Sequence, residues 1–141
     1  MADDFSDPLY RRALLRLAAD ATGSGRLASP DASASLHNPA CGDRITVDLA
    51  LAQGHIAALA HATQACVLTQ ASAALLAGTA QGHDAASLGA LADQVRAFLK
   101  GAPPPEGYEV FDGVAGHAGR HVCVMLPLEA ALKALAEAKQ P

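Results

Sequence analysis

Alternating apolar and polar residues predict strands in the first half of the chain. Between residues 44 and 51, one face would carry Ile45, Val47, Leu49 and Leu51, and the other Arg44, Thr46 and Asp48. Gln53-Gly54 supplies a turn, and residues 56–63 fit the returning strand of a hairpin. Residues 32–37 alternate small and polar side chains before Asn38-Pro39 ends the run. The pattern therefore predicts a three-stranded antiparallel sheet.

Helical spacing of apolar residues predicts helices before and after these strands. Ser6-Asp7-Pro8 is typical of a helix start, because a capping side chain precedes a proline whose φ suits the first turn. The apolar face that follows consists of Tyr10, Ala13, Leu14 and Leu17. Residues 20–31 contain glycines and a proline and predict a loop. Residues 66–77 predict a second helix, which Gly78 would end.

Two more helices are predicted in the second half of the chain. One would run over residues 84–100 and stop at Gly101. Its buried face would comprise Leu88, Leu91, Val95, Phe98 and Leu99. Residues 107–119, which are dotted with glycines, predict irregular structure. The last helix would begin near Val124 and tolerate Pro127 in its first turn. Its buried residues would be Leu128, Ala131, Leu132 and Leu135.

This order of elements predicts an α+β fold, with a small antiparallel sheet packed against about four helices. A length of 141 residues suits one domain over residues 1–141. The formal net charge of −4 and the scattered Lys and Arg residues argue against binding to nucleic acid. No stretch approaches the roughly 18 apolar residues of a membrane span, and the acidic N-terminus is unlike a secretory signal. We therefore expect a cytoplasmic protein with no membrane partner.

Three cysteines stand where metal or sulfur chemistry is favourable. Cys41 lies in a tight loop between two predicted strands, Cys66 begins a helix, and Cys123 stands just before another. The N-terminus of a helix favours thiolate over thiol. In a reducing compartment such thiols act as metal ligands or nucleophiles. Three cysteines can also be inert, buried small hydrophobic residues, and the spacing alone does not separate these alternatives.

Asp43 places a carboxylate two residues after Cys41. Three thiolates and one carboxylate would complete a tetrahedral zinc site. The same set could hold a [2Fe–2S] cluster, in which an oxygen ligand is weaker and eases release. Asp43 could instead only cap the Cys41 loop. A Cys/His hydrolase, with Cys41 as nucleophile and His37 or His121 as base, is a further alternative, but no oxyanion-hole motif accompanies them.

Three segments resemble motifs of the NifU/IscU/SufU family of iron–sulfur cluster assembly proteins. The first, Asn38-Pro39-Ala40-Cys41-Gly42-Asp43, resembles the loop N-P-x-C-G-D. The second, Ala65-Cys66-Val67-Leu68-Thr69-Gln70-Ala71-Ser72-Ala73, is similar to A/G-C-x-I-S-x-A-S-A. The third, Arg120-His121-Val122-Cys123-Val124-Met125-Leu126, is similar to R-x-x-C-x-x-L. The motifs keep the family's order, and the resemblance covers residues 7–135.

The resemblance implies the SufE/NifU-like fold. It also implies one exposed site that brings together Cys41, Asp43, Cys66 and Cys123. The function implied is that of a scaffold, which binds iron and sulfur through three cysteines and passes them to recipient apoproteins. A cysteine desulfurase would supply the sulfur as persulfide, with Cys123 as the candidate acceptor and with Arg120 and His121 as auxiliary residues.

Under this resemblance, the bound group would be a transient [2Fe–2S] cluster or zinc. The protein would act as a scaffold or sulfur carrier rather than as a free-standing enzyme, and as a monomer or homodimer.

Departures from the family pattern favour its SufU-like branch. The chain lacks the L-P-P-V-K stretch of IscU-type scaffolds, and Val122 replaces the His that precedes their third cysteine. The long separation of Cys66 from Cys123 leaves room for the predicted 84–100 helix, as in SufU-like members. The alternative function is therefore a zinc-bearing, SufU-like sulfurtransferase that accepts persulfide from a cysteine desulfurase. Two further departures count against a perfect match to the family rather than for a branch: Gln64 and Thr69 replace a Gly and a Ser of the second motif.

Overall fold

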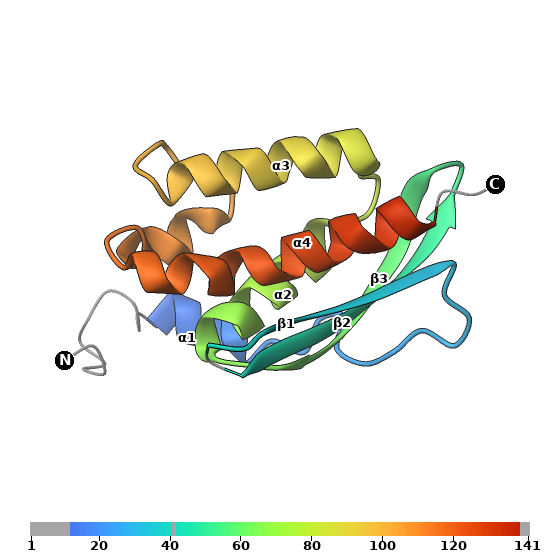
Figure 1. Cartoon of the computed structure of the whole chain (residues 1–141), viewed down its shortest axis with the longest axis horizontal. Helices are drawn as coiled ribbons and strands as arrows, with labels where there is room; N and C mark the ends of the chain where they lie inside the picture. The colour runs from blue at the N-terminus through green and yellow to red at the C-terminus, as the bar shows by residue number, and fades with distance from the viewer. Residues whose placement is uncertain (1–11, 41, 139–141) are drawn as a thin grey trace.

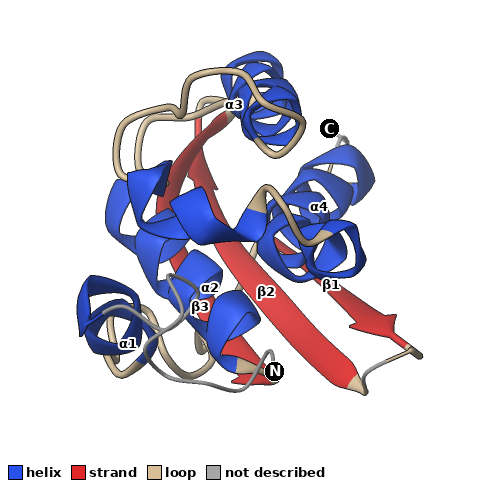
Figure 2. Ribbon diagram, turned by 90° about the vertical axis from the view of Figure 1, so that its left-hand side faces the viewer, coloured by secondary structure: helices blue, strands red, loops and turns tan. Residues whose placement is uncertain are grey.

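A three-stranded antiparallel sheet and a layer of helices build the protein, in a computed structural model that describes residues 12–40 and 42–138. The strand order is β1–β2–β3, with bounds β1 Ala32–Asn38, β2 Asp43–Ala52 and β3 His55–Gln64. The α-helices are α1 Arg12–Ala18, α2 Val67–Thr79, α3 Ala85–Phe98 and α4 His121–Glu137. Two 3-10 helices, η2 Tyr108–Val114 and η3 Ala118–Arg120, precede α4. The helices cover one face of the sheet (Figures 1 and 2), which confirms the predicted α+β fold.

The central helix of the layer is α4, which packs on β1 and β2 and contacts both α2 and α3. In Figure 1, α3 lies on the side of α4 that is away from the sheet. The sheet turns the predicted apolar face toward α4: Ile45, Val47 and Leu49 are buried. On α4, Leu128, Ala131 and Leu135 are buried as predicted, whereas Leu132 is only partly buried. Burying these two faces removes apolar side chains from water and so stabilises the fold.

The strand register brings the start of β2 and the end of β3 to the same end of the sheet. Asn38 pairs with Asp43 where β1 turns into β2, and Arg44 pairs with Gln64 at the end of β3. Since Cys66 follows Gln64 by two residues, the start of α2 lies beside Asp43. Strand pairing alone therefore unites two of the three cysteine motifs.

The second face of the sheet is partly covered by residues 20–31, the segment predicted as a loop. Asp48 points to this face and is fully buried. Arg26 donates to its carboxylate from Nε at 2.7 Å and from Nη2 at 3.1 Å. The backbone N–H of Leu27 and the hydroxyl of Ser33 donate to it as well, at 3.0 and 2.6 Å. Four donors thus satisfy a buried carboxylate that the alternation pattern only assigned to the polar face.

The predicted helix stop at Gly101 is confirmed, whereas the one at Gly78 is wrong. Gly101 has a φ of +116°, and its N–H bonds the carbonyl of Phe98 while the N–H of Ala102 bonds that of Ala97. These two bonds form a Schellman motif. Gly78 remains helical, and α2 ends at Thr79. The chain instead turns at Gly82, which has a φ of +90° and bonds the carbonyl of Ile56 in β3.

The start of α4 was predicted three residues too late. The helix begins at His121 because the 3-10 turn η3 leads directly into it through the helical backbone of Arg120. Cys123 therefore lies inside the first turn rather than before the helix, and Pro127 lies in the helix interior. The segment expected to be irregular contains η2 and η3, and η2 buries Tyr108, Phe111 and Val114 at a spacing of three.

Some predicted features fall outside the described residues, namely the helix start at Ser6-Asp7-Pro8, Tyr10 and Cys41. In α1, Leu14 is buried and Leu17 packs on the core as predicted, whereas Ala13 is exposed. No helix in the described ranges is both long enough and apolar enough to cross a membrane.

Candidate metal centre

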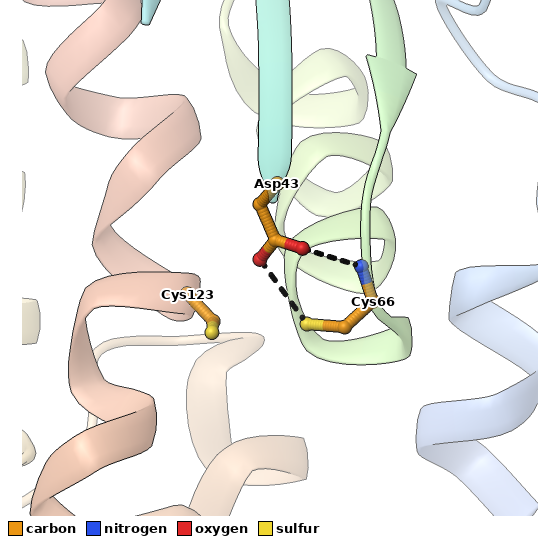
Figure 3. A group of neighbouring side chains, drawn as sticks. All are labelled: Asp43, Cys66 and Cys123. Carbon is orange, nitrogen blue, oxygen red and sulfur yellow. Dashed lines mark hydrogen bonds between the residues drawn. The ribbon is translucent and has the colours of Figure 1, made fainter. Parts of the chain in front are cut away.

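Three residues from three elements meet at one end of the sheet: Asp43, Cys66 and Cys123 (Figure 3). Asp43 is the first residue of β2, Cys66 is the N-cap of α2, and Cys123 lies in the first turn of α4. Their candidate ligand atoms all lie within 4.8 Å of one another. Asp43 and Cys123 are buried, and Cys66 is partly exposed. Of these three side chains, Cys66 is therefore the one that solvent and a partner can reach most easily.

The carboxylate of Asp43 binds the first turn of α2. Its Oδ1 accepts the backbone N–H of Cys66 at 3.0 Å, and its Oδ2 lies 3.4 Å from the Cys66 sulfur. The hydroxyl of Thr69 donates to Oδ2 at 2.9 Å. An N–H at the start of a helix has no partner within the helix, so Asp43 caps α2 from a neighbouring strand. From the sequence, the alternative to metal binding was that Asp43 caps the Cys41 loop.

The pKa of the Cys66 thiol is lowered to about 6. The largest cause is the hydrogen bond with the Cys123 thiol, and the amide and hydroxyl of Thr69 lower the pKa further. Burial and the negative charge of Asp43 act in the opposite direction. Cys66 therefore favours the thiolate at neutral pH, which is the form that binds metal and attacks sulfur.

Two sulfurs and a carboxylate oxygen suit zinc and iron in both chemistry and spacing. Zn–S bonds of about 2.3 Å and Zn–O bonds of about 2.0 Å place neighbouring ligand atoms of a tetrahedral site about 3.5 to 3.8 Å apart. The Asp43 oxygen and the Cys66 sulfur are already separated by 3.4 Å. Small side-chain movements would bring the Cys123 sulfur, which points toward them, to the same point (Figure 3).

The other predicted residues lie around this cluster without joining it. His121 is half-buried, and its Nε2 lies 3.1 Å from the carbonyl of Ala115. Arg120 is the N-cap residue of α4. His37 pairs with Arg44, which directly follows Asp43 in β2. Because successive residues of a strand point to opposite faces, His37 and Asp43 lie on opposite faces of the sheet. Within the described ranges no histidine joins the ligand cluster, so the hydrolase alternative gains no support from it.

Thr69 was noted in the sequence only as a departure from the family motif. The structure gives it a role, because it is fully buried and its hydroxyl contacts the Asp43 carboxylate and the Cys66 sulfur. The available signal was its position three residues after Cys66. In a helix whose N-cap is Cys66, the third residue after the cap lies beside the cap residue, so their side chains can make contact.

Comparisons with known proteins agree with the motifs. A model of the family described as NifU-like N terminal domain matches residues 9–136. A solved structure of a nitrogen-fixing NifU-like protein (N-terminal) from Brucella abortus is 32% identical with a TM-score of 0.88, covering 97% of this chain and 100% of that one. No curated protein matches the chain in a sequence comparison.

A more distant likeness concerns the fold alone. It is to a proposed iron-sulfur cluster assembly scaffold protein for the SUF system from thermophilic Fervidobacterium islandicum AW-1. That structure is 17% identical with a TM-score of 0.82, and the match covers 92% of this chain and 98% of that one. Because the family model spans nearly the whole sequence, the chain belongs to the NifU-like N-terminal domain family, as the three cysteine motifs predicted.

Proposed function

We propose that this protein is an iron–sulfur cluster assembly scaffold, which binds iron and sulfur through Cys41, Cys66 and Cys123 and passes them to recipient apoproteins. The observation that carries the proposal is the meeting of Asp43, Cys66 and Cys123 within 4.8 Å, in a member of the NifU-like family. A cysteine desulfurase would be the sulfur donor. The scaffold named for the SUF system has the same fold, which agrees with this function.

Cys41 would supply the third sulfur, although it lies outside the described residues. It is two residues from Asp43 in the chain, and two residues span at most about 7 Å. The strands on either side remain paired up to Asn38 and Asp43, so the connection between them is short. A thiol tethered this closely can reach the same ion as the Asp43 carboxylate.

Sulfur would arrive by thiol–persulfide exchange. The acceptor thiolate attacks the outer sulfur of the desulfurase persulfide, a new S–S bond forms, and the desulfurase cysteine leaves as a thiolate. The exchange needs no external oxidant or reductant. Cys123 is the candidate acceptor from the sequence, but it is only 3% exposed. Cys66 competes for this role, since it is partly exposed and has a pKa of about 6.

Asp43 would be the weak ligand of the set. An oxygen ligand holds a cluster of iron and sulfur less firmly than a thiolate does. The same carboxylate has an alternative set of partners in the N–H of Cys66 and the hydroxyl of Thr69. Release of the cargo would therefore return Asp43 to hydrogen bonds that the protein itself provides.

A zinc-bearing, SufU-like sulfurtransferase is the second candidate. It is favoured by α3, which lies between the second and third cysteine motifs, and by Val122, which is 39% exposed where IscU-type members carry a His. Zinc at this site would hold the cysteines as thiolates in the resting protein. One cysteine would then have to be released before it could accept sulfur.

Anaerobic reconstitution separates the two candidates. We would incubate the protein with its host's cysteine desulfurase, cysteine, ferrous iron and excess dithiothreitol, which reduces persulfide sulfur to sulfide, and measure bound iron and acid-labile sulfide. A scaffold should bind iron and sulfide in near-equal amounts and lose both in Cys41→Ser, Cys66→Ser and Cys123→Ser. The matched control is Asp93→Ala, an exposed position on α3 that should change neither amount.

Retained zinc without bound iron, together with protein-bound sulfur in a parallel incubation that omits dithiothreitol, would favour the sulfurtransferase instead. Peptide mapping of the persulfide by mass spectrometry would then decide between Cys66 and Cys123 as acceptor. Retention of full metal content in all three cysteine variants would refute both proposals.

A further inference from the structure

A single buried hydroxyl, that of Thr69, contacts every described residue of the ligand cluster. It lies 2.9 Å from Oδ2 of Asp43 and 3.6 Å from the sulfur of Cys66. The proton donated to Asp43 is shared with the backbone carbonyl of Cys123, 3.0 Å away, in a three-centre hydrogen bond. The three contacts reach β2, α2 and α4, and the Thr69 side chain is fully buried.

The carbonyl of Cys123 is available to Thr69 because of a proline one helical turn later. In an α-helix this carbonyl would accept the N–H of residue 127, and that residue is Pro127, which has none. A buried carbonyl without a donor is costly, so a hydroxyl from the neighbouring helix is a stabilising replacement. Pro127 in α4 and Thr69 in α2 therefore form a complementary pair that aligns the two helices.

A second hydroxyl of α2, one turn further along the helix, also donates to a carbonyl of α4. Ser72 is fully buried and donates to the carbonyl of Val124 at 2.7 Å. Thr69 and Ser72 lie on the same face of α2, and their acceptors are consecutive residues of α4. Ser72 bonds the main chain of α4, whereas Thr69 also bonds the Asp43 carboxylate. This difference makes Ser72 a matched control for Thr69.

We propose that Thr69 is the positioning residue of this metal centre, since its hydroxyl fixes the Asp43 carboxylate and the Cys123 main chain relative to Cys66. The inference deepens the proposed function and rests on it. The hydroxyl has one proton, which a three-centre hydrogen bond shares between the Asp43 carboxylate and the Cys123 carbonyl, so one atom links β2 to α4. Hydrogen bonds of this kind orient metal ligands, and removing them commonly weakens metal affinity by about 10- to 100-fold.

The competing explanation is that Thr69 only stabilises the packing of α2 on α4. Under that explanation, loss of the hydroxyl lowers the stability of the metal-free protein but leaves the affinity of the folded protein unchanged. Loss of the Ser72 hydroxyl should then have the same consequences. The two explanations differ in metal affinity and in the spectrum of the bound metal.

Cobalt(II) binding tests the inference on the full chain. We would compare wild type with Thr69→Val, which keeps the shape but removes the hydroxyl, Thr69→Ser, which keeps the hydroxyl, and Ser72→Ala. Affinity would come from competition with a chelator, ligand geometry from the thiolate-to-cobalt and d–d absorption bands, and folding from urea denaturation of the metal-free proteins. We expect Thr69→Val to bind cobalt about 10- to 100-fold more weakly with altered bands.

Thr69→Ser and Ser72→Ala should remain within about threefold of wild type, a small change beside the loss expected when a ligand-orienting bond is removed. Wild-type affinity and bands in Thr69→Val would overturn the inference, as would an equal loss of affinity in Ser72→Ala. A loss in Thr69→Ser would overturn it too, even where Thr69→Val fails to fold. Absence of thiolate-to-cobalt bands in the wild type would instead refute the proposed function, and this inference with it.

Discussion

Asp43 is a buried carboxylate at the junction of a strand and a helix, where its oxygens accept the backbone N–H of Cys66 and the hydroxyl of Thr69. Removal of the carboxylate leaves both donors without this acceptor. We predict that Asp43→Ala lowers the free energy of unfolding of the metal-free protein by about 1–3 kcal/mol. Asp43→Asn should cost less, because its amide oxygen still accepts one hydrogen bond. Urea denaturation in the presence of a chelator measures both values.

The control for this prediction is Asp93→Ala. Asp93 is exposed and accepts a hydrogen bond from Arg96 three residues later in the same helix. Such exposed pairs contribute roughly 0–1 kcal/mol, so the control should change stability little. An equal loss in Asp43→Ala and Asp93→Ala would contradict the capping of α2 by Asp43.

Single residues of the site were predictable from the sequence only where a short motif contains them. Asp43, Cys66 and Cys123 belong to such motifs, and the structure brings them together. The bond from Thr69 to the Cys123 carbonyl was not predictable, because it joins residues 54 positions apart. It depends on how α2 crosses α4, and no local pattern encodes that crossing.

At the scale of elements, hydrogen bonds to Asp48 hold residues 20–31 on the face of the sheet that lies opposite the helices. The hydrogen bond from Arg26 is the largest cause that holds the pKa of Asp48 below its usual value, and bonds from Ser33 and Leu27 act in the same direction. A carboxylate whose pKa is lowered on folding stabilises the protein above its unfolded pKa of about 3.9. That contribution is lost as the pH falls through the folded pKa.

We predict that Asp48→Asn lowers the free energy of unfolding at pH 7 by about 1.5–3 kcal/mol, the usual value of hydrogen bonds to a charged group. The difference in stability between wild type and variant should shrink below about pH 4. There the Asp48 carboxylate takes up a proton in the unfolded wild type before it does so in the folded protein, and the wild type loses stability. Urea denaturation from pH 3 to pH 7 measures it. A difference that stays constant over this range would contradict a role for the charge of Asp48.

Elements were more predictable than their ends. The alternation in β2 predicted both the strand and its buried face, since burial on one side of a sheet requires a period of two. Gly78 and Gly101 look alike in sequence, but only Gly101 adopts a positive φ. The end of α2 is decided by pairing, because Gly82 and His83 must reach Ile56 of β3. That constraint lies outside the helix and outside its sequence pattern.

For the molecule as a whole, the site joins the elements that form the core. β2, the N-cap of α2 and α4 each contribute one residue to the cluster, and α4 packs on both β2 and α2. A metal ion bound to the three side chains would therefore cross-link the sheet to both helices. The unfolded chain does not hold these residues together, so binding should be linked to folding.

We therefore predict that zinc raises the stability of the whole domain. At a free zinc concentration of about 100 times Kd, the free energy of unfolding should rise by about 2.7 kcal/mol, less any zinc that the unfolded chain binds. For a chain of this size the increase in Tm is on the order of 10 °C. Differential scanning calorimetry with and without a chelator measures the shift.

Two controls test whether the increase in Tm comes from the candidate site. Cys66→Ser should abolish most of the increase, and Mg²⁺, which prefers oxygen ligands, should not produce it. A similar rise in Cys66→Ser would show that zinc stabilises the fold from somewhere other than the cluster of Asp43, Cys66 and Cys123.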